Sequence, residues 1–142
     1  MQLSRREIRE SALILIFEKM FRDDANEEIV NLAENIDDFA MSIEVVDMFN
    51  GVYEKVEELD AVIAKFSEKR TVERIPKINL AILRLAIYEA RYNDKVPVNA
   101  AISEAVLLAK KYAHEPDVAF VNGVLGAYSR SEENTATDNE NV

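Results

Sequence analysis

The sequence predicts an all-α protein built from two packed helical subdomains. Only three Gly and three Pro stand among the 142 residues, whereas average usage would place about 17 of the two together in a chain of this length. So few turn-forming residues cannot build the many tight turns of a sandwich or a barrel. Apolar residues make up 49% of the chain and recur at helical spacing along almost all of it, which favours a helical core of ordinary size.

Residues 1–68 are expected to form an N-terminal subdomain of three helices. The first helix begins with the capping-box pattern of Ser4 and Glu7, and it carries apolar residues all round, as a central helix does. The acidic pair Asp23 and Asp24 is expected to open the second helix, because negative charge favours a helix N-terminus.

The third helix is predicted to be long. Ser42 stands where an N-cap belongs, and an apolar stripe then continues in steps of four and three as far as Phe66. This spacing is typical of one continuous helix of about 25 residues.

Residues 69–130 are expected to form a C-terminal subdomain, again with three helices. A connector with one turn leads into it, and Pro76, Pro97 and Pro116 each stand where a helix would begin, because proline fits the first turn of a helix. The last segment, 131–142, is polar and acidic, and its composition predicts a disordered tail.

The composition argues against most catalysis. The chain has no Cys and a single His, His114, which excludes disulfides, thiolate chemistry and most metal sites. Gly123 and Gly126 fall inside a helical pattern, where they are expected to allow close packing rather than to cradle a phosphate. No apolar stretch reaches the roughly 18 residues of a membrane span. We therefore expect no enzyme, no cofactor, no metal and no membrane partner, and a cytoplasmic location.

The net charge of −10 conceals an uneven distribution. Residues 1–22 hold five Lys and Arg against three Asp and Glu, and residues 69–114 hold nine against four. Residues 23–68 hold two against fourteen, and residues 115–142 hold one against six. The basic blocks are compatible either with a solvated surface or with an anionic partner.

Three arginines near the N-terminus stand where local electrostatics disfavours them. Arg5 and Arg6 follow the predicted N-cap, and Arg9 stands four residues after Arg5. A helix N-terminus disfavours cations, and like charges four residues apart repel each other. The cluster indicates either a phosphate-bearing ligand or simply a solvated, arginine-rich start.

Aromatic residues beside lysines give a second indication. Phe120 points well away from the apolar stripe of the last helix, and Tyr112 directly follows Lys110 and Lys111. Aromatic faces stack on unpaired bases while lysines meet phosphates. The alternative is that Phe120 packs against the other half of the molecule.

Four segments resemble the NusB family of bacterial transcription antitermination factors. They read SRREIRESALILIF near the start, then RIPKINLAILRLAIYE, VPVNAAISEAVLLAKKYA and FVNGVLG. The similarity runs from about Ser4 to Tyr128, and between residues 23 and 68 it extends only to the helical pattern. A related domain is found fused to an RNA cytosine methyltransferase, but this chain resembles the free-standing factor more closely.

The resemblance implies two helical subdomains and a function. It implies binding of the boxA segment of ribosomal RNA leader transcripts together with NusE, a ribosomal small-subunit protein, and indirect association with other Nus factors and RNA polymerase. The family's arginine-rich start falls on Arg5, Arg6 and Arg9, and its RNA-facing aromatic residues fall on Tyr112 and Phe120. Lys110 and Lys111, which stand beside Tyr112, are expected to add attraction for the RNA backbone. Some members form homodimers, and nothing in this sequence separates a monomer from a dimer. A chain this acidic is expected to hold RNA weakly unless a basic partner joins it.

The sequence departs from the family pattern at several positions. Glu7 replaces a basic residue, Asn79 and Leu80 replace an Asp-Arg pair, and Ser103 replaces an Asn; the second change could alter a partner surface. Two other functions stay open. One is a protein-interaction module that never touches RNA, and the other is a regulatory subunit of an RNA-modifying enzyme.

Overall fold

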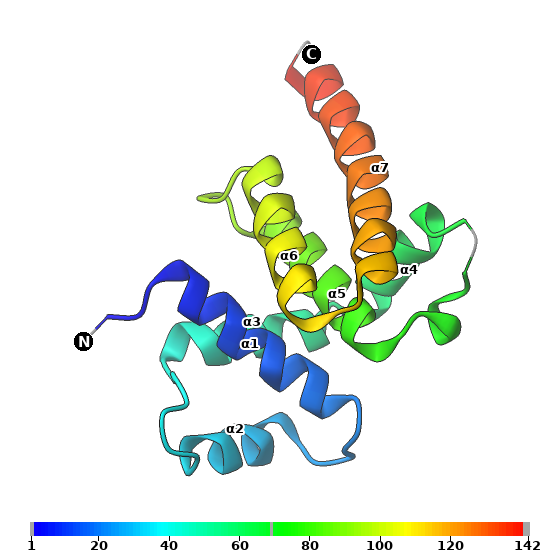
Figure 1. The fold of residues 1–142 in the computed structure, drawn as a ribbon. Helices are drawn as coiled ribbons and strands as arrows, with labels where there is room; N and C mark the ends of the chain where they lie inside the picture. Colours follow the sequence, from blue (N-terminus) through cyan, green and yellow to red (C-terminus); the bar gives the residue numbers. More distant parts are fainter. Residues whose placement is uncertain (1, 69, 141–142) are drawn as a thin grey trace. The chain divides into compact units, whose positions relative to one another are not determined.

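The all-α fold is confirmed. The computed structural model describes the backbone of residues 2–68 and 70–140, and the side chains of these residues up to Ser131. Across these ranges the chain forms seven α-helices, one short 3₁₀ helix and no strand (Figure 1). It divides into two compact units, Met1–Glu57 and Glu58–Val142. None of the described helices is long and apolar enough to cross a membrane.

The first unit holds three helices, of which α1 is central. Helix α1 (Arg5–Lys19) packs against both α2 (Asn26–Glu34) and α3 (Ile43–Glu54). The hydroxyl of Tyr53 donates a hydrogen bond of 2.6 Å to the carbonyl oxygen of Ile16 and joins α3 to α1. The largest fully buried side chains of this unit are Leu13, Leu15, Ile16, Ile29 and Phe49.

Two predicted helix starts are confirmed, and one is wrong. The Ser4 hydroxyl accepts a hydrogen bond from the Glu7 amide, and the Ser4 amide donates to the Glu7 carboxylate, which completes a capping box. Ser42 caps α3 by accepting from the amide of Val45. Helix α2 begins at Asn26 rather than at the acidic pair before it. Asp24 instead accepts a hydrogen bond from the Arg22 guanidinium, which lowers the pKa of that carboxyl.

The long helix expected over residues 42–66 is two helices. Helix α3 ends at Glu54, and α4 (Val56–Phe66) begins after a break at Lys55, where φ is −106° and ψ is 12°. Apolar spacing continues across the break, so periodicity alone could not reveal it. The division between the two units falls after Glu57, and α4 therefore belongs largely to the second unit. The predicted boundary after residue 68 had placed it with the first.

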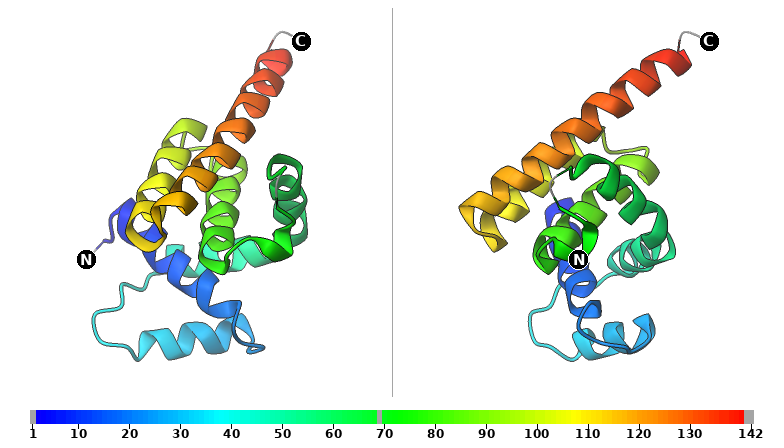
Figure 2. Two further views of the ribbon diagram at one scale, coloured as in Figure 1. Left: turned by 45° about the vertical axis from the view of Figure 1, so that its right-hand side comes forward. Right: turned by 90° about the vertical axis from the view of Figure 1, so that its right-hand side faces the viewer.

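The second unit is built around α5 (Lys77–Tyr92), which contacts both α6 (Val98–Tyr112) and α7 (Glu115–Glu140). Figure 2 shows α6 and α7 lying side by side, with the C-terminal end of α7 projecting beyond α6. A single 3₁₀ turn, η1 (Val72–Arg74), lies in the expected connector. The predicted proline-led starts of all three helices are confirmed.

Helix α4 is tied to α5 by polar side chains. The Arg84 guanidinium makes two hydrogen bonds of 2.8 Å to the Asp60 carboxylate. The Tyr92 hydroxyl donates a short hydrogen bond to Glu58, and the Arg91 Nε atom lies 3.4 Å from the same carboxylate. The hydrogen bond to Glu58 is the main reason why the pKa of Tyr92 is raised.

Helix α7 differs from its prediction in two respects. Its backbone stays helical to Glu140, through most of the segment for which a disordered tail was expected; residues 131–140 contain no Gly or Pro to end the helix,. A Cβ atom on Gly123 would meet no described atom within 4 Å, and one on Gly126 would lie 3.5 Å from the Nη1 atom of Arg130. Close packing therefore does not explain Gly123.

Candidate nucleic-acid interface

The start of α1 displays two of the predicted site residues. Arg5 and Arg6 occupy its first turn, directly after Ser4, and both side chains are exposed. The capping box fixes the backbone of this turn through bonds of 2.9 and 3.1 Å. Glu7, which departs from the family pattern, supplies the acidic half of that box. The result is a rigid helix end that presents two cations where the helix dipole disfavours them.

Arg9 lies differently from its two neighbours. Its side chain is only 6% exposed, and it has an interaction partner within the chain. Arginine can be buried in this way because its long aliphatic stem packs as an apolar chain does. The sequence had placed Arg9 with Arg5 and Arg6 in one cationic cluster, whereas at the surface only Arg5 and Arg6 are displayed.

Three predicted residues lie together at the end of α6. Lys110, Lys111 and Tyr112 form its last turn, and all three side chains are exposed. The Lys111 Nζ atom lies 5.4 Å from the centre of the Tyr112 ring. Cations are favoured at a helix C-terminus, so both lysines have a structural reason to be there that the arginines of α1 lack. Tyr112 keeps 39% of its surface exposed and offers a ring beside positive charge.

Phe120 lies one turn into α7, on a different face from the buried stripe of that helix. Val121 and Leu125 are fully buried, whereas Phe120 is partly exposed, as its position off the stripe predicted. The guanidinium carbon of Arg70 lies 4.5 Å from the centre of the Phe120 ring. An Nη1 atom of Arg70 also lies 3.8 Å from the Asp117 carboxylate. The partner of Phe120 is therefore a cation from the connector of the same unit.

Sequence reasoning missed Arg70. It is one of nine Lys and Arg residues between positions 69 and 114, and no local pattern distinguishes it from the others. Arg70 stands four residues after α4 ends, some fifty positions before Phe120, so only the tertiary fold brings the two together.

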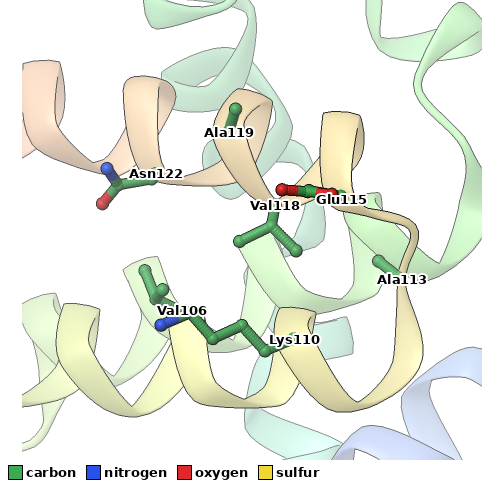
Figure 3. Close-up of a pocket in the computed structure, with 7 residues that line it drawn as sticks. All are labelled: Val106, Lys110, Ala113, Glu115, Val118, Ala119 and Asn122. Carbon is green, nitrogen blue, oxygen red and sulfur yellow. The ribbon is translucent and has the colours of Figure 1, made fainter.

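An open groove of about 560 Å³ lies along the junction of α6 and α7. Figure 3 shows Lys110 and Val106 on one wall and Val118 and Asn122 on the other. Phe120 does not line it, because residues two apart on a helix point to nearly opposite sides. The structure thus places Lys110 and Phe120 on different surfaces of the second unit.

Two other sets of residues that the sequence singled out, the Asn79-Leu80 pair and His114, have clear positions in the structure. Asn79 and Leu80 are 0% and 8% exposed, so they do not form the partner surface considered for them; α5 is buried around most of its circumference. His114 is exposed, and its carbonyl oxygen accepts the first backbone hydrogen bonds of α7. No cluster of His, Asp and Glu in the described part of the chain is arranged to hold a metal ion.

These features define a class, an all-helical protein that displays cations and aromatic rings of the kind that contact nucleic acid. The model of the NusB family matches residues 6–130, and the chain therefore belongs to the NusB family.

Curated relatives support the same assignment. The transcription antitermination protein NusB of Acetivibrio thermocellus is 40% identical over 98% of this chain and 97% of its own length. The NusB protein of a Thermoanaerobacter species is 50% identical over 58% of each chain. Both relatives bear the name of a transcription antitermination protein.

Solved structures show the same fold. The NusB structure from T. maritima superposes with a TM-score of 0.80 at 29% identity, covering 92% of this chain and 93% of that one. A NusB chain solved with NusE and double-stranded RNA superposes with a TM-score of 0.73 at 24% identity, covering 89% of this chain and 96% of that one. At that identity, the second comparison concerns the fold alone.

Proposed function

We propose that this protein is a bacterial transcription antitermination factor that binds boxA RNA of ribosomal RNA leader transcripts together with NusE. In this role it helps to assemble the antitermination complex, with other Nus factors, on RNA polymerase in the cytoplasm. The observation that carries the proposal is the exposed pair Arg5 and Arg6 on a capped helix end, where the helix dipole disfavours cations and a bound external anion would offset that cost,. The family membership supports it, and so does the fold shared with a NusB chain solved with NusE and RNA.

Each displayed residue has a proposed role. Arg5 and Arg6 engage phosphates or base edges, and Lys110 and Lys111 add attraction for the RNA backbone. Tyr112 and Phe120 stack on unpaired bases. Arg9 stays a predicted contact, which requires its buried side chain to be uncovered when RNA binds.

The net negative charge of the chain suggests why RNA binding would need a basic protein partner. A net charge of −10 opposes RNA at long range, because like charges repel across the solvent. A basic partner such as NusE would lower this barrier, so we expect the protein alone to bind RNA weakly and the complex to bind it tightly.

The test is a salt series of boxA RNA binding, with and without NusE, for the wild type and for Arg5→Ala/Arg6→Ala. Loss of two phosphate contacts on a single strand should reduce the slope of log K against log salt by about 1.4. The affinity should fall roughly tenfold or more. The matched control is Arg91→Ala/Lys95→Ala, which removes the same charge from exposed positions outside the proposed site.

Three outcomes separate the candidate functions. Unchanged affinity and slope in Arg5→Ala/Arg6→Ala would exclude these arginines from the RNA site. Binding to NusE without RNA crosslinks at Tyr112 or Phe120 would favour an RNA-independent interaction module. Co-purification with a separate methyltransferase would favour a subunit of an RNA-modifying enzyme.

A further inference from the structure

Phe120 is covered on one face in the free protein. The Arg70 guanidinium carbon lies 4.5 Å from the ring centre, within the range of a cation–π contact. The ring face that meets Arg70 is therefore closed to a base until Arg70 moves. Asp117, one turn before Phe120 on α7, lies 3.8 Å from the guanidinium and holds it in this position.

The backbone that carries Arg70 is fixed, but the end of its side chain is held weakly. The Arg70 amide donates to the carbonyl oxygen of the buried Ser67 at 3.1 Å, and the Ser67 hydroxyl donates to the Arg70 carbonyl oxygen at 3.0 Å. The ion pair with Asp117 is long, and the Arg70 side chain is 38% exposed. Exposed ion pairs and exposed cation–π contacts each contribute little to stability, so neither contact holds the guanidinium firmly.

Arg70 also has space into which it can move. It lines an open groove of about 420 Å³ beside the connector, together with Glu68 and Glu73. A guanidinium that leaves Phe120 therefore stays at the surface. It also stays close to whatever binds the ring, because its backbone does not need to move.

We propose that Arg70 is a further RNA-binding residue, which covers Phe120 in the free protein and exchanges the ring for a phosphate when RNA binds. The proposal rests on the proposed function, in which Phe120 stacks on an unpaired base. The base takes the ring face that Arg70 leaves, and the guanidinium then binds the adjoining phosphate. Arginine suits both positions because its planar fork stacks on rings and binds phosphate through two parallel hydrogen bonds.

Asp117 acts in this scheme as a positioning residue. Its carboxylate competes with phosphate for the same guanidinium, so it keeps Arg70 on the ring while RNA is absent. Removal of the carboxylate charge should therefore favour the RNA-bound arrangement, and the effect should depend on the presence of Arg70.

The first experiment measures boxA RNA binding in the presence of NusE across a salt series. Arg70→Ala should weaken binding about five- to tenfold and reduce the salt slope by about 0.7, the value for one phosphate contact on a single strand. Arg70→Lys should keep the slope but lose two- to threefold in affinity, because lysine lacks the planar fork. Arg91→Ala removes the same charge from the α5 end of the unit, where it pairs with Glu58, and should leave binding within twofold of the wild type.

The second experiment tests the coupling to Asp117. Asp117→Asn should tighten RNA binding two- to fivefold in the wild type and have little effect in the Arg70→Ala background. Equal tightening in both backgrounds would show that Asp117 acts through its own charge, and would overturn its positioning role. Thermal melts should show that all these variants are folded.

The failure of this proposal can be distinguished from the failure of the RNA site. If Phe120→Leu weakens binding but Arg70→Ala behaves like Arg91→Ala, the RNA site stands and Arg70 has no part in it. Tighter binding by Arg70→Ala would also overturn the proposal, since Arg70 would then only obstruct the ring. If Phe120→Leu and Arg5→Ala/Arg6→Ala both bind as the wild type does, the proposed RNA site is wrong, and the role of Arg70 falls with it.

Discussion

Replacing Asn79 by leucine should make the protein more stable, although the residue lies in the core. Asn79 stands in the first turn of α5 and is 0% exposed. Neither its side-chain nitrogen nor its side-chain oxygen has a hydrogen-bond partner among the described residues. Both polar atoms have lost their water and gained no bond in exchange, so the amide destabilises the folded state.

The size of the effect follows from three contributions. A buried polar group without a partner costs about 1–3 kcal/mol. Leucine also has the higher helix propensity, by a few tenths of a kcal/mol. Its greater bulk in a packed core offsets about 1 kcal/mol of this gain. The net expectation for Asn79→Leu is an increase of about 1–2 kcal/mol in the free energy of unfolding, or a rise of about 3–8 °C in the midpoint of thermal unfolding.

Urea unfolding followed by circular dichroism at 222 nm measures the effect, with Asn79→Ala and Leu83→Ala as companions. Asn79→Ala removes the polar atoms without added bulk and should stay within about 1 kcal/mol of the wild type. Leu83 is fully buried in the same helix, and its truncation should cost the usual 2–5 kcal/mol. A loss of 2 kcal/mol or more in both Asn79 variants would show that the amide makes hydrogen bonds after all, and would refute the reasoning.

Two further predictions concern the second unit. Gly123→Ala should raise the free energy of unfolding by about 0.5–1 kcal/mol in urea titrations, because a Cβ there meets no described atom within 4 Å,; a loss would show that this surface is occupied. Tyr92→Phe removes the hydrogen bond to Glu58. Because the folded-state pKa of Tyr92 lies above its usual 10.0, this stabilisation is present below pH 10 and is lost as the pH rises through the raised pKa. The difference in stability between the wild type and Tyr92→Phe should therefore narrow above pH 10, and a constant difference would contradict the assignment.

Much of the fold could be predicted because its determinants are local. The hydroxyls of Ser4 and Ser42 accept the amide hydrogen bonds that their spacing indicated, since a cap depends only on residues within one turn. The break at Lys55 could not be predicted in this way. The break consists of one residue, neither Lys55 nor its immediate neighbours are Gly or Pro, and the apolar stripe continues across it. Which unit a helix joins depends on tertiary contacts that periodicity does not contain.

The residues of the candidate site likewise fall into two groups, those that the local sequence predicts and those that only the tertiary fold reveals. Arg5 and Arg6 could be identified from the sequence because the helix dipole acts within a single turn. The half-exposed position of Phe120 followed from its angle on the helix. The contact between Arg70 and Phe120 and the burial of Arg9 could not be predicted, because each depends on segments that only the fold brings together.

The two groups of displayed cations also differ in what they contribute to the free protein. Lys110 and Lys111 lie at a helix C-terminus, where they stabilise α6, so their replacement should weaken both the fold and RNA binding. Arg5 lies at a helix N-terminus, where its charge costs about 0.3–1 kcal/mol,. Its replacement by alanine should therefore stabilise the free protein while it weakens RNA binding. A residue that is retained for its ligand rather than for the fold is expected to behave in this way: its replacement raises stability and lowers binding affinity.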